Sequence, residues 1–206
     1  MAVLPDNAMN PATGYVYVAN VGTAKPTIDT GFDYTDPTTW GAEMQDPGPP
    51  STPLWKAVGH TSLENGLEFT SDGDDPETLG TWQTANLRTT NPTRTYSVTI
   101  NLASFTLETY QLYYGGGTVI GVAPDQSFVI PDSPVAQEKA LLVLAVDGQH
   151  LVSQHFKKVS IIGADSITYD PAALSEMPVR ATILGAQTYG TGVAGQGEIS
   201  QRISLS

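Results

Sequence analysis

Cysteine is absent from the 206 residues. Its absence excludes disulfide bonds, thiolate metal sites and cysteine nucleophiles, so packing alone must stabilise the fold. Positive charge is also scarce, because 9 Lys and Arg residues stand against 21 Asp and Glu residues and give a formal net charge of −12. A surface this acidic repels phosphate backbones, so the composition argues against a nucleic-acid-binding protein.

Long apolar runs are missing as well. No window of the sequence approaches the roughly 20 consecutive apolar residues of a membrane span. The stretch from Met1 to Asp6 also lacks the basic start and apolar run of a signal peptide. We therefore expect no membrane partner and a protein that folds in a cytoplasm.

Histidine occurs only at positions 60, 150 and 155. His150 and His155 are five residues apart in a predicted strand and so point to opposite faces, which prevents a shared metal site. The acidic run Asp72–Glu77 lacks the alternating carboxylates and the distal Glu of an EF-hand loop, and we interpret it as a solvated turn. With no catalytic constellation left, the sequence predicts neither an enzyme nor a cofactor.

The residues that are abundant are those of short strands. β-Branched and aromatic residues are frequent, and 20 Gly and 15 Pro residues interrupt them, which predicts a mostly β fold in a single domain over residues 1–206. Thr93–Leu102 alternates apolar and polar residues and predicts a strand with one buried face. Further strands are expected at Gly14–Val21, Trp55–His60, Leu67–Ser71 and, as the last strand, Met177–Leu184.

Two turn dipeptides predict hairpins. Asn65-Gly66 separates the expected strands Trp55–His60 and Leu67–Ser71, and both turn positions tolerate positive φ. Asp147-Gly148 joins the continuously apolar run Leu141–Val146 to His150–Ile162 in the same way. We expect the apolar run to lie in the core.

One helix is predicted at Ser104–Tyr114. Its apolar stripe consists of Ala103, Leu107, Tyr110 and Tyr114, spaced by four, three and four residues. Ser104 suits the N-cap position, and the glycines at 115–117 end the helix. We expect Leu107 and Tyr110 to pack on the core.

Two segments differ from the rest in composition. Residues 22–53 are rich in Pro, Asp, Thr and Gly, and so long a structureless loop is uncommon in a compact domain unless it has a function. We expect an arm that contacts a neighbouring subunit, with Trp40 as its anchor, because aromatic anchors carry much of the energy of an interface. Residues 185–206 contain five glycines and are expected to form a mobile or partner-ordered tail.

One family resemblance covers Trp55–Gly115. Trp55–Phe69 is similar to the "GHTS…GLEF" stretch of siphophage major tail proteins, notably those of phages infecting actinobacteria. Asp72–Gln83 and Leu87-Arg88 are similar to that family's acidic turn, its "LGTWQ" strand and its arginine. Tyr96–Thr99 and the "LYYG" sequence at Leu112–Gly115 follow in the family's order.

The resemblance implies a tail tube protein with a β-sandwich-like or barrel-like fold and one packed α-helix. Such subunits form homohexameric rings whose strands join into a β-barrel around a lumen, and the rings stack around a tape measure protein. It further implies tail tip, initiator and tail terminator proteins as partners, and a place in the virion tail after assembly in the cytoplasm of the bacterial host. Six copies carry a formal charge of −72, six times −12, around a lumen that DNA traverses without specific binding.

Acidic residues near the second predicted hairpin are the candidates for the lining of that lumen. Glu68 is the first choice, because side chains alternate along a strand and Glu68 must face away from Leu67 and Phe69. The full set of candidates is Glu64, Glu68, Asp72, Asp74, Asp75 and Glu77. Repulsion by such a lining would keep DNA from adhering to the wall.

Two alternative functions stay open on the sequence. Trp40, Trp55 and Trp82 would suit a sugar-stacking platform in a carbohydrate-binding or adhesion module of the β-sandwich type. Another virion part, such as a tail terminator or a decoration protein, would form a single ring or attach to a shell without polymerising.

Overall fold

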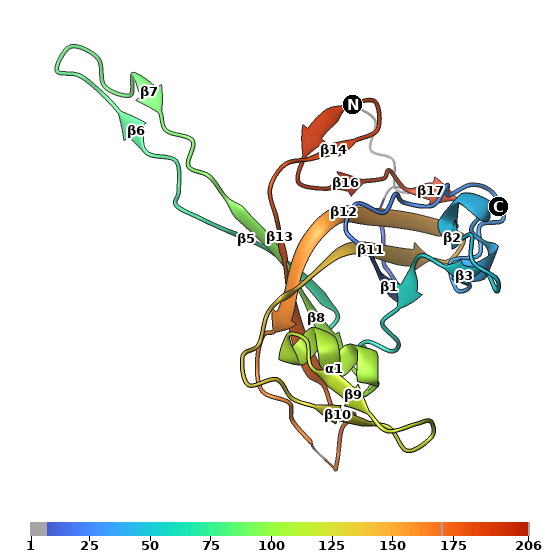
Figure 1. Cartoon of the computed structure of the whole chain (residues 1–206). Coiled ribbons are helices and arrows are strands. Elements are labelled where there is room, and N and C mark those ends of the chain that lie inside the picture. The colour runs from blue at the N-terminus through green and yellow to red at the C-terminus, as the bar shows by residue number, and fades with distance from the viewer. Residues whose placement is uncertain (1–7, 170, 206) are drawn as a thin grey trace.

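The computed structural model describes residues 8–169 and 171–205, and its centre is an antiparallel sheet (Figure 1). Neighbouring strands along the main path are β4, β1, β11, β12, β13, β8 and β5, while β16 and β17 also pair with β12. The bounds of these nine strands are β1 (Thr13–Ala19), β4 (Lys56–Ala57), β5 (Leu67–Asp72), β8 (Thr95–Leu102), β11 (Gln137–Asp147), β12 (His150–Gly163), β13 (Met177–Ile183), β16 (Glu198–Ile199) and β17 (Ile203–Ser204). Met1–Asp6, which the signal-peptide prediction concerns, lie outside the described residues.

Shorter elements surround this sheet. Four two-stranded sheets pair β2 with β3, β6 with β7, β9 with β10 and β14 with β15. Their bounds and those of the helices are η2 (Pro37–Thr39), η3 (Ala42–Met44), β2 (Gln45–Asp46), β3 (Thr52–Pro53), β6 (Thr78–Leu79), β7 (Arg88–Thr89), α1 (Leu107–Tyr114), β9 (Thr118–Ile120), β10 (Ser127–Val129), β14 (Gln187–Tyr189) and β15 (Val193–Gly195). The fold is therefore mostly β with one α-helix over the described ranges, as predicted. Within those ranges, no helix has the length and apolar character needed to cross a membrane.

The hairpin of β11 and β12 forms the centre of the sheet and confirms the prediction from Asp147-Gly148. Asp147 pairs with His150, and Gly148 adopts a φ of 59° that favours glycine. Alternate residues of β11 enter two different cores. Leu141 and Val143 lie in the first core, and Leu142 and Leu144 lie in the second core, on the other face of the sheet. A strand buried on both faces must be apolar at every position, which explains the continuous run at Leu141–Val146.

Strand β8 has the predicted alternation. Val98, Ile100 and Leu102 are buried, while Thr95 is exposed and Thr99 is half-buried. The predicted hairpin around Asn65-Gly66 is wrong, however. Strand β5 pairs with β8 and β4 pairs with β1, so the two predicted partners belong to opposite ends of the sheet.

Helix α1 is present but begins later than predicted. Thr106, not Ser104, is the N-cap, and it shares a capping box with Thr109. Ser104 instead accepts a hydrogen bond from the backbone N–H of His60 at 2.7 Å. The buried residues of the helix are Thr109 and Leu112. Tyr110 packs against the core as predicted, although both it and Leu107 are only half-buried.

The segment 22–53 packs on its own chain rather than extending from it as an arm, and its predicted contact with a neighbouring subunit stays a prediction. Phe32, Trp40 and Met44 are buried in the second core against Tyr17 of β1 and Leu142 of β11. Figure 1 shows this segment in blue and cyan against one end of the sheet. Its many Pro and Asp residues form short turns, for example at η2, where Asp36 caps the backbone N–H of Thr38. The segment is a cover for the second core.

The C-terminal segment is also ordered on its own chain, which corrects the prediction of a mobile or partner-ordered tail for residues 185–206. Strands β14 and β15 form a hairpin, and β16 and β17 pair with the first half of β12. The backbone N–H of Ser200 donates to Ser153 O at 2.9 Å, and that of Leu205 donates to Gln149 O at 2.8 Å. Strand β13 is consequently not the last strand.

Candidate assembly surfaces

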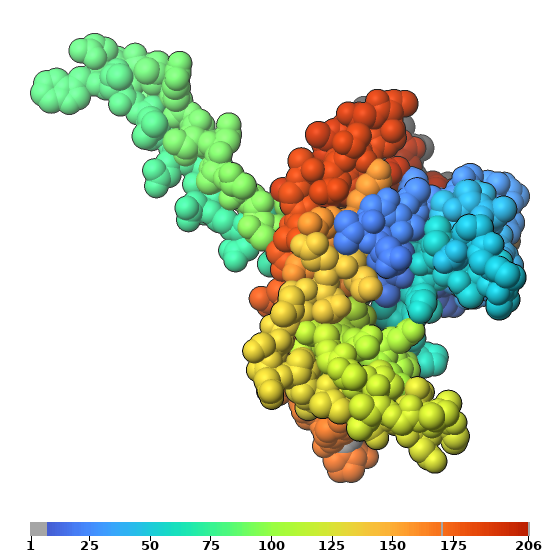
Figure 2. Space-filling view, in the orientation of Figure 1, coloured from blue at the N-terminus to red at the C-terminus, as the bar shows by residue number. Residues whose placement is uncertain are grey.

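A long hairpin leaves the body of the molecule at residues 73–94, which we call the projecting hairpin (Figures 1 and 2). It extends β5 and β8, and its outer part is held by β6, by β7 and by the Leu87 N–H, which donates to Leu79 O at 2.8 Å. Every residue from 71 to 89 is exposed. An isolated two-stranded ribbon is marginally stable in water, so we expect this one to gain stability from a partner.

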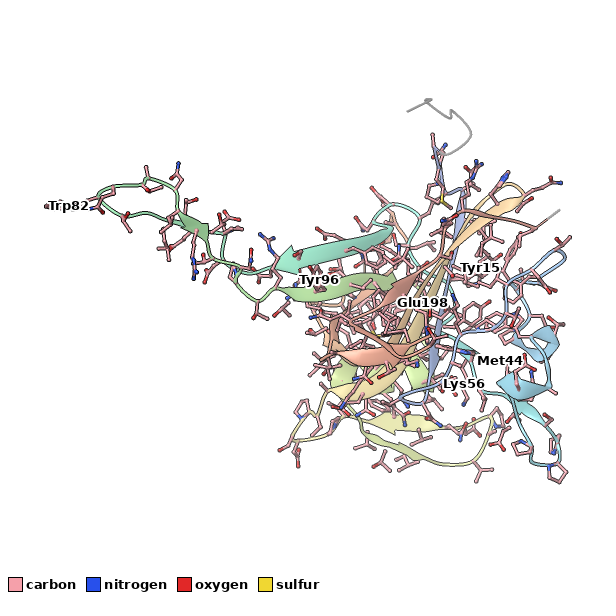
Figure 3. The ribbon with its side chains drawn as sticks, turned by 90° about the horizontal axis from the view of Figure 1, so that it is seen from above. Tyr15, Met44, Lys56, Trp82, Tyr96 and Glu198 are labelled. Carbon is pink, nitrogen blue, oxygen red and sulfur yellow. The ribbon has the colours of Figure 1, made fainter. Side chains whose placement is uncertain are left out.

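The three tryptophans lie in three different environments. Trp55 is completely buried and Trp40 is 4% exposed, while Trp82 at the tip of the projecting hairpin is fully exposed (Figure 3). Their positions rule out a sugar-stacking platform built from all three. They also correct the choice of Trp40 as a subunit anchor, because its ring is already enclosed by its own chain. Of the three tryptophans, Trp82 is the one that its own chain leaves uncovered. Its polar neighbours Thr81 and Gln83 are the feature of the sequence that could have indicated this exposure.

The polar face of the sheet at β5, β8 and β13 carries Glu68. In register, Glu68 lies beside Thr99, and Thr99 lies beside Arg180. The adjacent hollow has a volume of about 630 Å³ and is also lined by Glu64 and Glu176. Asn65 Nδ2 donates to Glu176 Oε2 at 2.7 Å and so ties the loop before β5 to the segment before β13. Glu68 thus points away from the core, opposite Leu67, as its place in the strand predicted.

The six candidate lining carboxylates do not form one group. Glu64 and Glu68 share the hollow on the polar face. Asp72 ends β5, and the other three candidates, Asp74, Asp75 and Glu77, belong to the projecting hairpin. Asp75 lies 3.5 Å from Arg94, but this pair is exposed and contributes little to stability. The first two carboxylates are therefore the ones that a single sheet face presents together.

Strand β5 is the last strand on the main path of the sheet. Within the described ranges no further strand covers its outer edge. A row of unpaired backbone N–H and C=O groups on an edge strand is a template for pairing with another chain. This edge continues directly into the projecting hairpin, so two unpartnered features adjoin.

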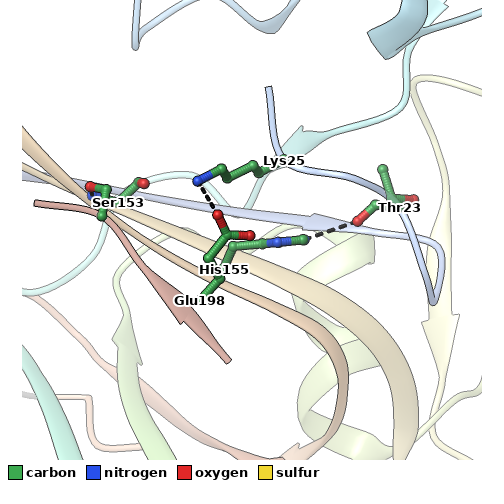
Figure 4. A network of polar contacts seen from close by, with 6 residues as sticks. Thr23, Lys25, Ser153, His155 and Glu198 are labelled. Atoms are coloured by element: carbon green, nitrogen blue, oxygen red, sulfur yellow. Dashed lines mark hydrogen bonds and ion pairs between the residues drawn. The ribbon is translucent and has the colours of Figure 1, made fainter. Parts of the chain in front are cut away.

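A polar network fastens the C-terminal segment to the sheet (Figure 4). His155 of β12 is 1% exposed, and its Nε2 lies 2.9 Å from Thr23 O. Burial lowers the pKa of His155, since the charged ring would lose its hydration. Lys25 and Glu198 form an ion pair beside it, which links the loop after β1 to β16. The enclosed ring and the ion pair serve to fix these segments.

The other histidine of β12 lies on the opposite face, as predicted. His150 Nδ1 is 3.1 Å from Arg202 Nη2, a contact separate from the network around His155. Among the described residues, no group of three or more His, Asp or Glu side chains is arranged to hold a metal ion.

Comparison with known proteins identifies the class. The profile of the phage tail tube protein family matches residues 1–192, and the chain belongs to this family. Its role is accordingly structural, in a phage tail tube. The chain is 35% identical over 194 residues to "Major tail protein Gp23" of Mycobacterium phage D29, which covers 89% of this chain and 88% of that protein. It is 34% identical over 193 residues to "Major tail protein Gp23" of Mycobacterium phage L5, with the same coverage. The resemblance over Trp55–Gly115 is thereby confirmed.

Proposed function

We propose that the chain assembles as homohexameric rings that stack into the tail tube of a siphophage, and that DNA passes through the lumen of this tube during ejection. The observation that carries the proposal is the open edge of β5, which continues into the projecting hairpin. Closing a sheet through neighbouring subunits removes exposed strand edges. The whole chain acts as one assembling unit in the virion tail.

Other tail components follow from the same proposal. A stacked tube needs a protein that starts it, one that sets its length and one that ends it. The partners are therefore a tail tip or initiator complex, a tape measure protein inside the lumen and a tail terminator. Assembly takes place in the cytoplasm of the bacterial host. The surface is acidic, with a formal net charge of −12 per copy, which suits a passage that must not retain DNA.

Electron microscopy of the purified protein, alone and with its initiator complex, tests the proposal. We expect rings with sixfold symmetry or tubes built from them. A sugar-binding module would instead stay a monomer or small oligomer, and a tail terminator would stop at a single ring. A chain that stays monomeric at high concentration and in purified virions would overturn the proposal.

We propose further that the polar face of β5, β8 and β13 lines the lumen, with Glu68 and Glu64 as its carboxylates. The face carries hydroxyl and amide side chains beside Glu68, including Thr99 and Asn101, and these offer DNA no cationic partner. Arg180 lies within the same hollow and offsets part of the negative charge. The other four candidate carboxylates would reach the lumen only if the base of the projecting hairpin lies there. They are Asp72, Asp74, Asp75 and Glu77.

Glu68→Lys should permit tube assembly and slow DNA ejection, with the larger effect at low salt. The side chain is exposed on a sheet face, so the substitution leaves the core intact. A lysine would attract phosphate where the glutamate repels it, and screening limits that attraction to about 8–10 Å at physiological salt. Ejection kinetics of assembled virions at two salt concentrations measure the effect.

Glu43→Lys is the matched control, because it makes the same charge change on the segment that covers the second core. It should leave ejection unchanged at both salt concentrations. Equal kinetics for Glu68→Lys and Glu43→Lys virions at low salt would show that Glu68 does not face the lumen.

A further inference from the structure

An apolar groove lies at the base of the projecting hairpin, and we call it the base groove. Its volume is about 520 Å³. Five of its lining residues are large and apolar, and the other six are hydroxyl, amide or glycine residues, so none of the eleven is charged. These residues are Phe69, Thr70, Ser71, Tyr96, Ser97, Gln154, Phe156, Ile183, Gln196, Gly197 and Ile199. Tyr96 and Ile199 are themselves exposed, so the groove opens to the surface.

The tip of the projecting hairpin has matching chemistry. Trp82 is fully exposed, and Leu79 and Leu87 below it are 55% and 56% exposed. The seven residues 80–86 contain no charged side chain. A tryptophan buries about 150–250 Å² of surface when it is enclosed, so this tip carries a large apolar surface that its own chain leaves uncovered.

We infer that the base groove of one copy of this chain receives Trp82 from the hairpin tip of a second copy. The inference rests on the proposed function and names the surface through which two copies meet. In this arrangement, the aromatic side chains of the groove contact the indole ring of Trp82. Such an anchor in a pocket is the usual centre of an interface.

The groove and the tip cannot meet within one chain. The groove begins at Ser71 and Tyr96, where the two legs of the hairpin leave the body, and Trp82 lies at the far end (Figure 3). Trp82 lies ten positions after Asp72, and an extended leg of that length reaches about 30 Å. Folding the tip back onto its own base would break the pairing of β6 with β7. The tip that fills the groove must therefore come from another copy of the chain.

Charge also favours a second copy as the occupant. Two copies with a formal net charge of −12 each repel one another over most of their surfaces. An uncharged tip entering an uncharged groove is a contact that avoids this repulsion and desolvates no ionised group. The acidic residues Asp74, Asp75 and Glu77 lie on the leg, between tip and base, and stay outside the groove.

The groove also has a polar group for the indole N–H. Gln196 lines it, and the side-chain oxygen of Gln196 has no hydrogen-bond partner within the described residues. A docked indole would offer its Nε1–H as the donor that this oxygen lacks, and a buried indole N–H generally finds such a partner. Because tip and base are different patches, the contact is head-to-tail and repeats from copy to copy, which generates rings or filaments.

Cysteine cross-linking tests this contact cleanly, because the chain contains no cysteine. Gln83→Cys places a thiol beside Trp82 and keeps the anchor, and Ser71→Cys is a near-isosteric change in the groove. The two single variants are mixed under assembly conditions and oxidised gently. A disulfide needs Cα atoms about 4.4–6.8 Å apart, so only a docked tip gives the mixed dimer on a non-reducing gel.

Leu63→Cys is the control for the groove. Leu63 is 93% exposed and lines the adjacent hollow with Met9 and Gly14, so it samples random collisions more readily than Ser71. We expect about tenfold more mixed dimer with Ser71→Cys than with Leu63→Cys, as a specific anchor requires. Adding Trp82→Ala to the Gln83→Cys chain should reduce the product to the control level.

The outcomes separate this inference from the proposed function. If tubes form but Ser71→Cys yields no more product than Leu63→Cys, the docking inference is overturned and the tail tube proposal stands. The same holds if Trp82→Ala leaves the product unchanged. If electron microscopy shows neither rings nor tubes, the proposed function itself fails.

Discussion

Replacing Trp40 with alanine should lower the free energy of unfolding of the monomer by about 3–5 kcal/mol, the usual cost of removing a large buried aromatic side chain. The Trp40 ring packs edge-on against Tyr17, with centroids 4.8 Å apart, and lies 5.3 Å from the ring of Phe32. Its Nε1–H donates to Asp33 O at 2.6 Å. The substitution would leave a cavity in the second core and an acceptor without its donor.

Urea unfolding at a concentration where the chain is monomeric measures this loss. Trp82→Ala is the matched control, because it removes the same side chain from a fully exposed position and should change the free energy by less than about 0.5 kcal/mol. Unchanged unfolding of the Trp40→Ala monomer, together with lost assembly, would restore Trp40 as a subunit anchor and contradict its placement in the core.

The contrast between these two tryptophans shows where sequence reasoning stops. Trp40 follows a stretch rich in Pro, Asp and Thr, and such composition predicts a loop without showing what the loop covers. The sheet has a second apolar face because alternate residues of β1 and β11 point to it. That face needs a cover, and the segment 22–53 supplies it. This cover depends in part on β11, where Leu142 lies 102 positions after Trp40 in the chain.

Local signals predicted the elements better than their partners. The alternation in β8 and the apolar run in β11 are properties of consecutive residues, and both strands form as predicted. The Asn65-Gly66 dipeptide favours a tight turn, but β5 finds a longer partner in β8, with six residue pairs in register. The chain does turn there, with Gly66 at a φ of 52°, but the turn does not join β4 to β5 as a hairpin. The lumen-facing role of Glu68 depends on an assembled ring and stays a prediction.

The C-terminal segment illustrates the same limit. Its glycines indicate mobility when the segment is considered alone. Strand β12 is fourteen residues long, however, and β13 pairs only with its second half, from Val159 to Gly163. The first half has an uncovered edge, and β16 and β17 occupy it. An available edge elsewhere in the fold therefore orders a segment that its own composition describes as flexible.

Shortening the projecting hairpin should abolish tube formation without destabilising the monomer. Glu77 and Thr90 face each other, since the Thr90 N–H donates to Glu77 O at 2.8 Å and the Glu77 N–H donates to Thr90 Oγ1 at 2.9 Å. Replacing residues 78–89 with Asn-Gly would close the ribbon at this pair with a two-residue turn of the favoured type. The deleted residues are exposed and bury nothing on the body, so the free energy of unfolding should change by less than about 1 kcal/mol.

Assembly should respond in the opposite way, because the shortened chain keeps its base groove but has no tip to fill the groove of another copy. Electron microscopy and sedimentation of the purified variant would then show unassembled subunits where the parent chain forms rings or tubes. Trp82→Phe, which keeps the hairpin length and an aromatic ring, is the companion variant and should retain part of the assembly. The only charged residue lost in the deletion is Arg88, so a change in net charge of one unit cannot account for an all-or-none loss. Tubes of normal appearance from the shortened chain would show that the hairpin is not needed for assembly, and the interface would then have to lie along the edge of β5 alone.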